Sequence, residues 1–555
     1  MRAARNVLLE IDLTQPMVEV EPDDPIAKLR MRGKPRLRPL LRTLYDAGTD
    51  PHVVGLVARI GNAPASLAQV QEIRAAVQAF AASGKPTVAF AETFGETAPG
   101  SLPYYLATGF SEVWLQPSGE VNLLGVAAEV RFMRGLLDKL GVEPQLHQRH
   151  EYKNAADRIT QTDFTPAHKQ ALDRLTESAW EQIVAGVAAT RSLGTDEVQR
   201  LADRAPLFAQ EALDARLIDR VGYRDQVYAD VRRRVGGDVR LLFADKWSKH
   251  EQPLTRITRE IKAKKAASIA VVEGHGGIVT GRSRRTPTMG QVMGSDTISA
   301  AFRAAVKNDH VKAIVFRVDS PGGSYVASDT VWREVVCARE AGKTVVVSMG
   351  SMAGSGGYFV ACPADVIVAQ AGTLTGSIGV FGGKPVVTGL TQKLGLNYAE
   401  VHRGANARMY SPHSSFDETE LERLNTFLDG VYDDFTAKVA EGRKLTKEAV
   451  HAIAKGRVWT GADAHGIGLV DEIGGLRDAV RIARERAGLP DDAPVRPAVV
   501  LPPLARLKPP RSTDDPRAAA AVSTWMSGWG ELAAVAEHLG MSALGPLTMP
   551  MVTLG

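Results

Sequence analysis

Apolar, β-branched runs alternate with helical patterns throughout the second half of the chain. The runs that predict buried strands are Ser268–Val272, Ala313–Val318, Thr344–Met349 and Val366–Ala369. Between the runs, the spacing of apolar residues predicts helices such as Thr297–Lys307 and Ser328–Ala341. Buried strands that alternate with helices predict an α/β fold in which most strands run parallel.

The chain also repeats itself. The segment HVVGLVARIGNAPAS from His52 aligns with HVKAIVFRVDSPGGS from His310. Further along, the register changes by four residues, and Gly100 and Gly125 then align with Gly354 and Gly379. Near the end of each half, LIDRVG aligns with LVDEIG. Because self-similarity at a long period indicates repeated structural units, we predict two tandem copies of one fold.

These patterns divide the chain into five predicted parts. They are an N-terminal copy (1–240), a basic linker (241–267), a C-terminal copy (268–488), a Pro-rich linker (489–519), and an amphipathic helix with a tail (520–555). The last helix is predicted from apolar residues at helical spacing between Val522 and Leu539. It lacks basic residues, which favours docking onto the protein body over lying in a membrane.

Composition and charge exclude several classes of protein. Hydrophobic residues make up 44% and charged residues 23% of the 555 residues, which excludes wholesale disorder. A net charge of +4 is too small to predict a nucleic-acid partner. The two cysteines, Cys337 and Cys362, lie in apolar runs and are expected in the core. Clustered metal ligands and Gly-rich phosphate loops are missing, so no metal or other cofactor is predicted.

No secretory signal or membrane-spanning segment is predicted. The apolar run near the N-terminus is short and ends at Glu10 and Asp12. Elsewhere, Gly and Pro interrupt every long apolar stretch, including the one from Leu539 to Gly555.

Chemistry is expected where the two copies differ. The second copy has DSPGGS, from Asp319 to Ser324, directly after a predicted strand, whereas the first copy has GNAPAS. Proline fixes φ and glycine permits positive φ, so Gly322 and Gly323 can aim backbone N–H groups outward. A plain turn is the alternative interpretation.

The second difference is GSMAGSGGY, which follows the strand Thr344–Met349. It places Ser355 between small residues at the expected start of a helix, where a nucleophile has free N–H groups and a positive helix end beside it. The N–H of Gly356 can pair with one from the preceding glycine turn as an oxyanion hole. The first copy has Ser101-Leu102-Pro103 here, and Pro103 lacks an N–H. A helix-capping serine is the alternative.

A serine nucleophile also needs a base. None of the six histidines of the second copy has a recognisable catalytic spacing. Lysine can act instead where desolvation lowers its pKa. The alignment of the copies singles out Lys153, which stands opposite Ala407. An isolated lysine is normally a surface residue, and only its place in the repeat distinguishes this one.

Taken together, these motifs resemble the signal peptide peptidase A family in its long, duplicated form. The matching pieces are DSPGGS from Asp319, SGGY from Ser355, TLTGSIG from Thr373, WTG from Trp459 and Tyr152-Lys153. The resemblance implies a crotonase/Clp-protease-like spiral of strands and helices in each copy. It also implies a membrane-associated serine protease with a Ser/Lys dyad that degrades remnant signal peptides, and a homotetramer with its sites facing inward.

The resemblance further implies a role for each matched residue. Ser355 is the nucleophile, and Lys153, from the N-terminal copy of the same or a neighbouring chain, is its general base. Ser377 orients the lysine, and the N–H of Gly356 with that of Gly322 or Gly323 forms the oxyanion hole. The implied partners are short apolar peptides, further copies of the chain and, through peripheral contact, a membrane.

Three other functions remain open at this point. Crotonase-type folds also hydrolyse or isomerise acyl-CoA, but that chemistry needs neither a serine between glycines nor a lysine from the other copy. A Clp-type Ser-His-Asp peptidase would resemble its family only with a histidine about 25 residues after the serine, where Val380 stands. A catalytically dead peptide-binding scaffold is the third alternative, and the intact Ser/Lys/glycine set argues against it.

Overall fold

The computed structural model describes residues 6–19, 35–63, 65–247, 266–286, 290–499, 512, 515 and 545–550. The chain forms two compact units. The first consists mainly of Met1–Ala128 and Thr176–Ile261, and the second of Glu129–Leu175 and Lys262–Thr553. Most of the predicted basic linker, at residues 248–265, and the predicted helix at Val522–Leu539 lie outside the described residues.

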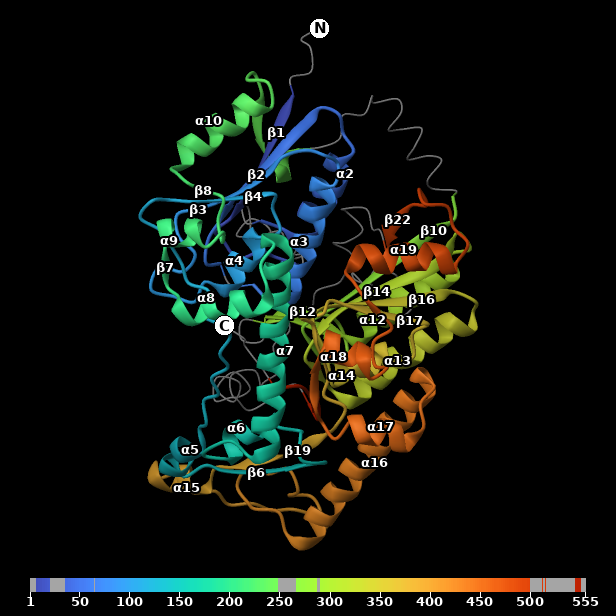
Figure 1. The fold of residues 1–555 in the computed structure, drawn as a ribbon. Coiled ribbons are helices and arrows are strands. Elements are labelled where there is room, and N and C mark those ends of the chain that lie inside the picture. Colours follow the sequence, from blue (N-terminus) through green and yellow to red (C-terminus); the bar gives the residue numbers. More distant parts are fainter. Residues whose placement is uncertain are drawn as a thin grey trace. The chain divides into compact units, whose positions relative to one another are not determined.

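The first unit is built on a six-stranded sheet in which every strand pair is parallel. In sheet order its strands are β8 (Arg220–Val221), β4 (Glu112–Leu115), β3 (Thr87–Ala91), β2 (Val53–Ile60), β1 (Val7–Leu13) and β9 (Arg240–Phe243). A separate antiparallel pair joins β5 (Glu120–Val121) and β7 (Leu207–Phe208). Figure 1 shows this sheet in blue and green among its helices.

Helices cover both faces of this first sheet. They are α2 (Leu37–Gly48), α3 (Leu67–Ala81), α4 (Ser101–Ala107), α8 (Thr195–Arg204), α9 (Ala209–Asp214), α10 (Arg224–Arg234), the 3₁₀ turn η1 (Ala244–Lys246) and the last part of α7 (Pro166–Arg191). Successive strand residues face opposite sides, so Leu9 packs in the cluster with α2 and α3, and Leu8 packs with Val227 and Val231 of α10. Burial on both faces explains why the strands read as continuous apolar runs.

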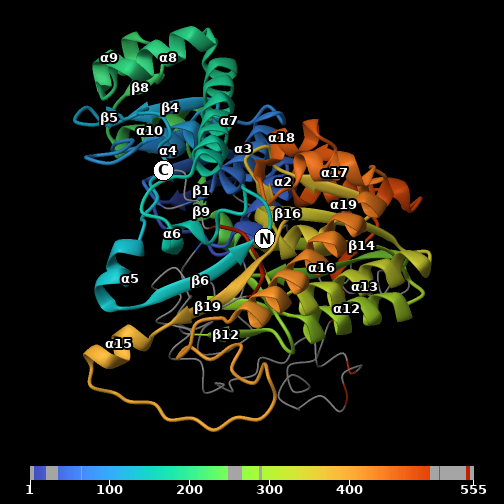
Figure 2. The same cartoon turned by 90° about the horizontal axis from the view of Figure 1, so that it is seen from below.

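The second unit contains a larger, mainly parallel sheet. Its main path is β20 (Val458–Thr460), β18 (Leu374–Gly376), β16 (Thr344–Gly354), β14 (Val311–Ser320), β10 (Ser268–His275) and β22 (Val495–Pro497), with β17 (Val366–Ala369) and β21 (Glu472–Ile473) paired beside β16. A five-stranded sheet joins β12 (Arg284–Thr286), β13 (Gly290–Gly294), β11 (Gly277–Val279), β15 (Gly322–Gly323) and β23 (Leu547–Thr548). An antiparallel pair joins β6 (Glu143–Gln148) to β19 (Phe381–Val386), which run side by side in Figure 2.

Helices also pack on both faces of the main sheet of the second unit. The helices of the second unit are α5 (Arg134–Leu140), α6 (Asp157–Thr160), the first part of α7, α12 (Ser295–Lys307), α13 (Tyr325–Glu340), α14 (Gly356–Ala361), α15 (Thr388–Lys393), α16 (Glu418–Arg443), α17 (Lys447–Ile453), α18 (Gly461–Gly466) and α19 (Leu476–Arg486). Val315 of β14 packs with α19, whereas its neighbour Phe316 packs in the cluster with α12 and α13. The alternation again buries both faces.

The predicted α/β fold is therefore confirmed. Each predicted strand lies within an observed one, and the strand Thr344–Met349 extends as β16 as far as Gly354, next to the candidate nucleophile. The two copies also share particular contacts. The Tyr104 hydroxyl donates to the Leu217 carbonyl (2.7 Å), and the aligned Tyr358 hydroxyl donates to the Leu469 carbonyl (2.8 Å). The duplication seen in the sequence is thus preserved in packing.

Among the described residues, no helix is both long and apolar enough to cross a membrane.

Candidate active site

Ser355 lies at a sharp turn between a strand and a helix. β16 ends at Gly354 and α14 begins at Gly356, so Ser355 is the only residue between them. Its backbone has φ 53° and ψ −115°, a conformation that non-glycine residues rarely adopt. Such strain is concentrated at active sites, and a strand-to-helix turn of this kind presents the side chain of a nucleophile.

Lys153 reaches Ser355 from the loop between β6 and α6. Its Nζ lies 2.8 Å from Ser355 Oγ and donates to both the carbonyl oxygen and the Oγ of Ser377, each at 3.0 Å. All three side chains are completely buried. The structure thus brings together Ser355, Lys153 and Ser377 within the second unit and within one chain.

Burial changes the proton affinity of the lysine. The pKa of Lys153 lies well below its usual range because desolvation disfavours the ammonium ion. No ion pair links Lys153 to a carboxylate in the described part of the chain, so nothing of opposite charge offsets the desolvation. A lysine in this setting can be neutral near physiological pH and can accept a proton.

The backbone around Lys153 is fixed by the loop between α17 and β20. The N–H of Tyr152 donates to the Lys455 carbonyl (3.1 Å), and the N–H of Ser377 donates to the Arg457 carbonyl (2.7 Å). Between these two contacts, Gly456 adopts φ 85°, and a Cβ there would lie 2.5 Å from the Lys153 nitrogen. Only glycine fits at this position. The sequence analysis did not identify this requirement, because its one signal was a single glycine in the segment AKGR.

Ser377 is held in register with the nucleophile. It follows β18 directly and has a positive φ of 49°. The N–H of Ser355 donates to the carbonyl of Gly376 (2.8 Å), which ties the nucleophile's turn to the residue before Ser377. Backbone hydrogen bonds and the pairing of β16 with β18 at Gly354 and Gly376 therefore fix the position of Ser377 relative to Ser355.

The three predicted oxyanion glycines also meet. Gly322 has φ 99°, and a Cβ added there would lie 2.6 Å from the Gly356 nitrogen. Gly356 opens α14, and the N–H groups of a first helical turn have no partner within the helix. The N–H of Gly322 donates to Ser320 Oγ (3.1 Å), a hydroxyl that sequence reasoning did not single out.

The corresponding serine of the first copy has a different environment. Ser101 Oγ donates to the Gly125 carbonyl (2.7 Å) and accepts from the Gly125 N–H (3.2 Å). Its hydroxyl is therefore bonded to backbone and not to a titratable side chain. This difference agrees with the prediction that only the second copy carries the chemistry.

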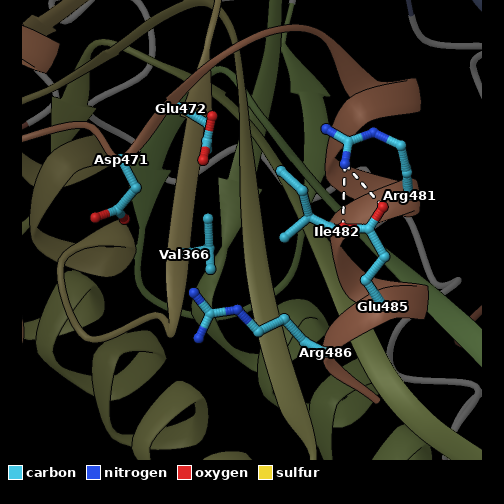
Figure 3. A pocket seen from close by; sticks show the side chains of 7 residues that line it. All are labelled: Val366, Asp471, Glu472, Arg481, Ile482, Glu485 and Arg486. Carbon is cyan, nitrogen blue, oxygen red and sulfur yellow. Dashed lines mark hydrogen bonds and ion pairs between the residues drawn. The ribbon is translucent and has the colours of Figure 1, made fainter. Parts of the chain in front are cut away.

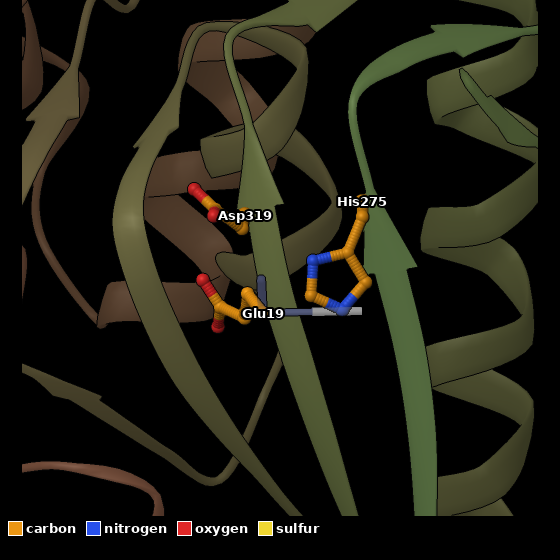
Figure 4. Close-up of side chains that lie close together, drawn as sticks. All are labelled: Glu19, His275 and Asp319. Atoms are coloured by element: carbon orange, nitrogen blue, oxygen red, sulfur yellow. The ribbon is translucent and has the colours of Figure 1, made fainter. Parts of the chain in front are cut away.

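A histidine-aspartate pair lies elsewhere in the second unit. Figure 4 shows His275 at the end of β10 and Asp319 on β14. A ring nitrogen of His275 and a carboxylate oxygen of Asp319 lie within 4.8 Å of each other. The Asp319 carboxylate accepts from the N–H of Met352 (3.1 Å). Neither residue contacts Ser355 Oγ, whose hydrogen-bond partner among the described residues is Lys153. The pair does not complete a Ser-His-Asp triad.

The second unit also has an open pocket of about 360 Å³ between β17, β21 and α19 (Figure 3). Its lining consists of Val366, Asp471, Glu472, Arg481, Ile482, Glu485 and Arg486. Arg481 donates to Glu485 one helical turn further on, at 2.9 and 3.1 Å. The lining holds no nucleophile and none of the predicted site residues.

Comparison with known proteins identifies the family. The sequence model of the family described as "Peptidase family S49" matches residues 79–237 and 337–490, which together cover more than half of the chain. The chain belongs to peptidase family S49. The two matched segments fall in the two halves of the repeat, as expected for a duplicated member.

Curated relatives agree with this assignment. The chain is 33% identical over 464 residues to "Protease 4" of Salmonella typhi, and the aligned region covers 81% of this chain and 72% of that protein. It is 29% identical over 484 residues to "Serine protease SPPA, chloroplastic" of Arabidopsis thaliana, covering 86% and 70%. Among solved structures, ClpP1 from Listeria monocytogenes matches 40% of this chain and 99% of its own, with 14% identity and a TM-score of 0.22.

Family membership confirms the predicted resemblance and the prediction of a peptidase. It agrees with the serine type, which the name of the Arabidopsis relative states. It also removes the main support for the alternative of an acyl-CoA hydrolase or isomerase, because the matched family is one of peptidases.

Proposed function

We propose that this member of family S49 is a serine endopeptidase in which Ser355 and Lys153 form the catalytic dyad. The observation that supports the proposal most strongly is the 2.8 Å separation of Lys153 Nζ and Ser355 Oγ in a fully buried site. A nucleophile and its base must lie within hydrogen-bond reach, and this pair does.

The first half of the reaction forms an acyl-enzyme. Neutral Lys153 takes the hydroxyl proton of Ser355 as Oγ attacks the carbonyl carbon of the peptide bond. The negative charge that develops on the carbonyl oxygen is stabilised by the N–H of Gly356 with that of Gly323, or with that of Gly322 if the Gly322 N–H gives up its hydrogen bond to Ser320 Oγ. The Lys153 ammonium then protonates the leaving nitrogen, the C–N bond breaks, and the N-terminal part of the substrate remains as an ester on Ser355.

The second half releases the acyl group. Water attacks the ester carbonyl while Lys153 takes one of its protons, and the same N–H groups again stabilise the oxyanion. Lys153 returns that proton to Ser355 Oγ as the ester bond breaks, so the dyad is regenerated. While Lys153 is neutral, Ser377 accepts hydrogen bonds from Lys153 Nζ through its carbonyl oxygen and its Oγ, which leaves the single lone pair of Nζ directed at Ser355 Oγ.

The substrates that we propose are short apolar peptides, including remnant signal peptides. The small residues around Ser355, such as Ala353 and Gly354, leave room for small or aliphatic side chains. Assembly into a homotetramer and peripheral contact with a membrane are proposed on the resemblance to the duplicated signal peptide peptidases.

The pH dependence of peptide hydrolysis tests the dyad. Below the pKa of Lys153 the ammonium has no lone pair, so kcat/KM should rise with pH through that pKa and then level off. Because burial lowers the pKa from 10.5, half of the plateau should be reached at a pH clearly below 10.5. The measurement is cleavage of a fluorogenic apolar peptide between pH 5 and pH 10, with circular dichroism at each pH. A rate that is flat, or that falls with rising pH while the fold is intact, would contradict a lysine base.

A further inference from the structure

A segment close to the C-terminus lies against the proposed oxyanion glycines. β23 (Leu547–Thr548) pairs antiparallel with β15, with Thr548 opposite Gly322 and Leu547 opposite Gly323. The N–H of Met549 donates to the Pro321 carbonyl. On its other side the segment is also bonded, because the N–H of Phe381 donates to the Pro546 carbonyl (3.2 Å). The segment 545–550, with the two-residue strand β23 at its centre, is therefore hydrogen-bonded on both sides.

The side chains of this strand are fully packed. Leu547 and Met549 are 0% and 1% exposed, and Leu547 belongs to the same core cluster as Ala353 and Tyr358. Apolar side chains two residues apart on a strand point the same way, and here both are buried. A Cβ on Gly354, the residue before Ser355, would lie 2.2 Å from the Met549 sulfur. The strand thus contacts the turn that carries the nucleophile.

The backbone of the strand also lies where an oxyanion hole is expected. A Cβ on Gly322 would lie 1.9 Å from the Leu547 carbonyl oxygen and 2.6 Å from the Gly356 nitrogen. A peptide carbonyl therefore occupies the space beside the proposed oxyanion donors. Substrate peptides that add to an exposed sheet edge take this form, with main-chain bonds for affinity and pockets for alternate side chains.

We propose that Gly545–Pro550 is an intramolecular inhibitor that occupies the substrate position along β15. The inference rests on the proposed function of the same site. It also describes the preferred substrate as an extended peptide with aliphatic or thioether side chains at two positions separated by one residue. A substrate must displace the segment, so the segment acts as a competitor at high effective concentration.

Truncation tests the proposal. A chain that ends at Leu544 should cleave a short apolar peptide with a kcat/KM about tenfold higher than the full chain, through a lower KM at unchanged kcat, as removal of a tethered competitor requires. The matched control ends at Pro550, retains the strand, and should behave like the full chain. The peptide GPLTMP, added separately, should inhibit the shorter chain competitively. Equal kcat/KM for the two truncated chains, with no inhibition by GPLTMP, would overturn the proposal.

A binding measurement separates this proposal from the proposed function. Both truncations are made in the Ser355→Ala chain, and fluorescent GPLTMP is titrated by anisotropy, which requires no catalysis. Binding to the chain ending at Leu544 at least tenfold tighter than to the chain ending at Pro550 supports occlusion, whether or not the protein cleaves peptides. Equal binding, or no binding to either, would overturn it. If the shorter chain fails to fold, the Leu547→Asp/Met549→Asp double variant of the full chain replaces it, with the same expected outcomes.

Discussion

Replacement of Ser355 by alanine is expected to lower kcat for peptide hydrolysis by about 10⁶, which is the scale of loss when a serine nucleophile is removed from a dyad or triad. The variant lacks the atom that forms the acyl-enzyme, and no other hydroxyl of the described residues hydrogen-bonds Lys153 except that of Ser377. The measurement is hydrolysis of a fluorogenic apolar peptide by purified wild type and variant.

The matched control is Ser101→Ala. Ser101 is the aligned serine of the first copy and is also buried, and within the described part of the chain its hydroxyl hydrogen-bonds the backbone at Gly125. It should leave kcat within a few-fold of wild type once folding has been checked by circular dichroism. If Ser355→Ala retains wild-type turnover, or if Ser101→Ala loses as much as Ser355→Ala does, the nucleophile has been assigned to the wrong copy or residue.

Lys153→Met is expected to lower kcat by about 10²–10⁴, the usual contribution of a general base. Methionine keeps an unbranched apolar stem of similar length but has no proton acceptor of comparable basicity. Because none of the described residues pairs an opposite charge with the buried lysine, its removal leaves no unpaired charge among them and should not lower the melting temperature. Loss of activity with an unchanged or higher melting temperature therefore distinguishes a missing base from a missing fold.

The control for Lys153→Met is Lys169→Met, the same substitution at an exposed site. The Lys169 side chain is 67% exposed and pairs with Asp173 one turn further along α7. Its loss should change neither kcat nor the melting temperature measurably, since exposed i,i+4 ion pairs contribute about 0.3–0.5 kcal/mol. Equal kcat values for the Lys153 and Lys169 variants would contradict a role for Lys153 in proton transfer.

Most of the fold could be predicted from the sequence, and so could the candidate site residues, whose catalytic roles stay predictions. Continuous β-branched runs are typical of strands buried on both faces, and β14, β16 and β17 appear where those runs lie. The repeat made both residues visible, because Lys153 stands opposite Ala407, and Ser355 is followed by two glycines where the aligned Ser101 is followed by Leu102 and Pro103. A single-copy sequence would have offered a serine among glycines and one lysine among many.

Other features depend on tertiary packing that no local pattern encodes. Residues 129–175, which carry Lys153, belong to the same compact unit as Ser355, although they lie in the first half of the repeat. The positive φ of Ser355 and Ser377 and the close approach of Gly456 are set by neighbouring strands and loops. The strand at Leu547–Thr548 had only a weak signal, the alternation of Leu547 and Met549 around Thr548 between two prolines.

The measurement that tests the Ser355/Lys153 dyad most directly is the rate at which a fluorophosphonate probe labels Ser355. It is compared between wild type and Lys153→Met at a pH on the activity plateau, with the labelled residue identified by peptide mass spectrometry. The dyad predicts labelling of wild type at Ser355, and labelling of Lys153→Met slower by about 10² or more, because the probe reacts with an activated hydroxyl. Labelling of both proteins at the same rate, or at a residue other than Ser355, would contradict it.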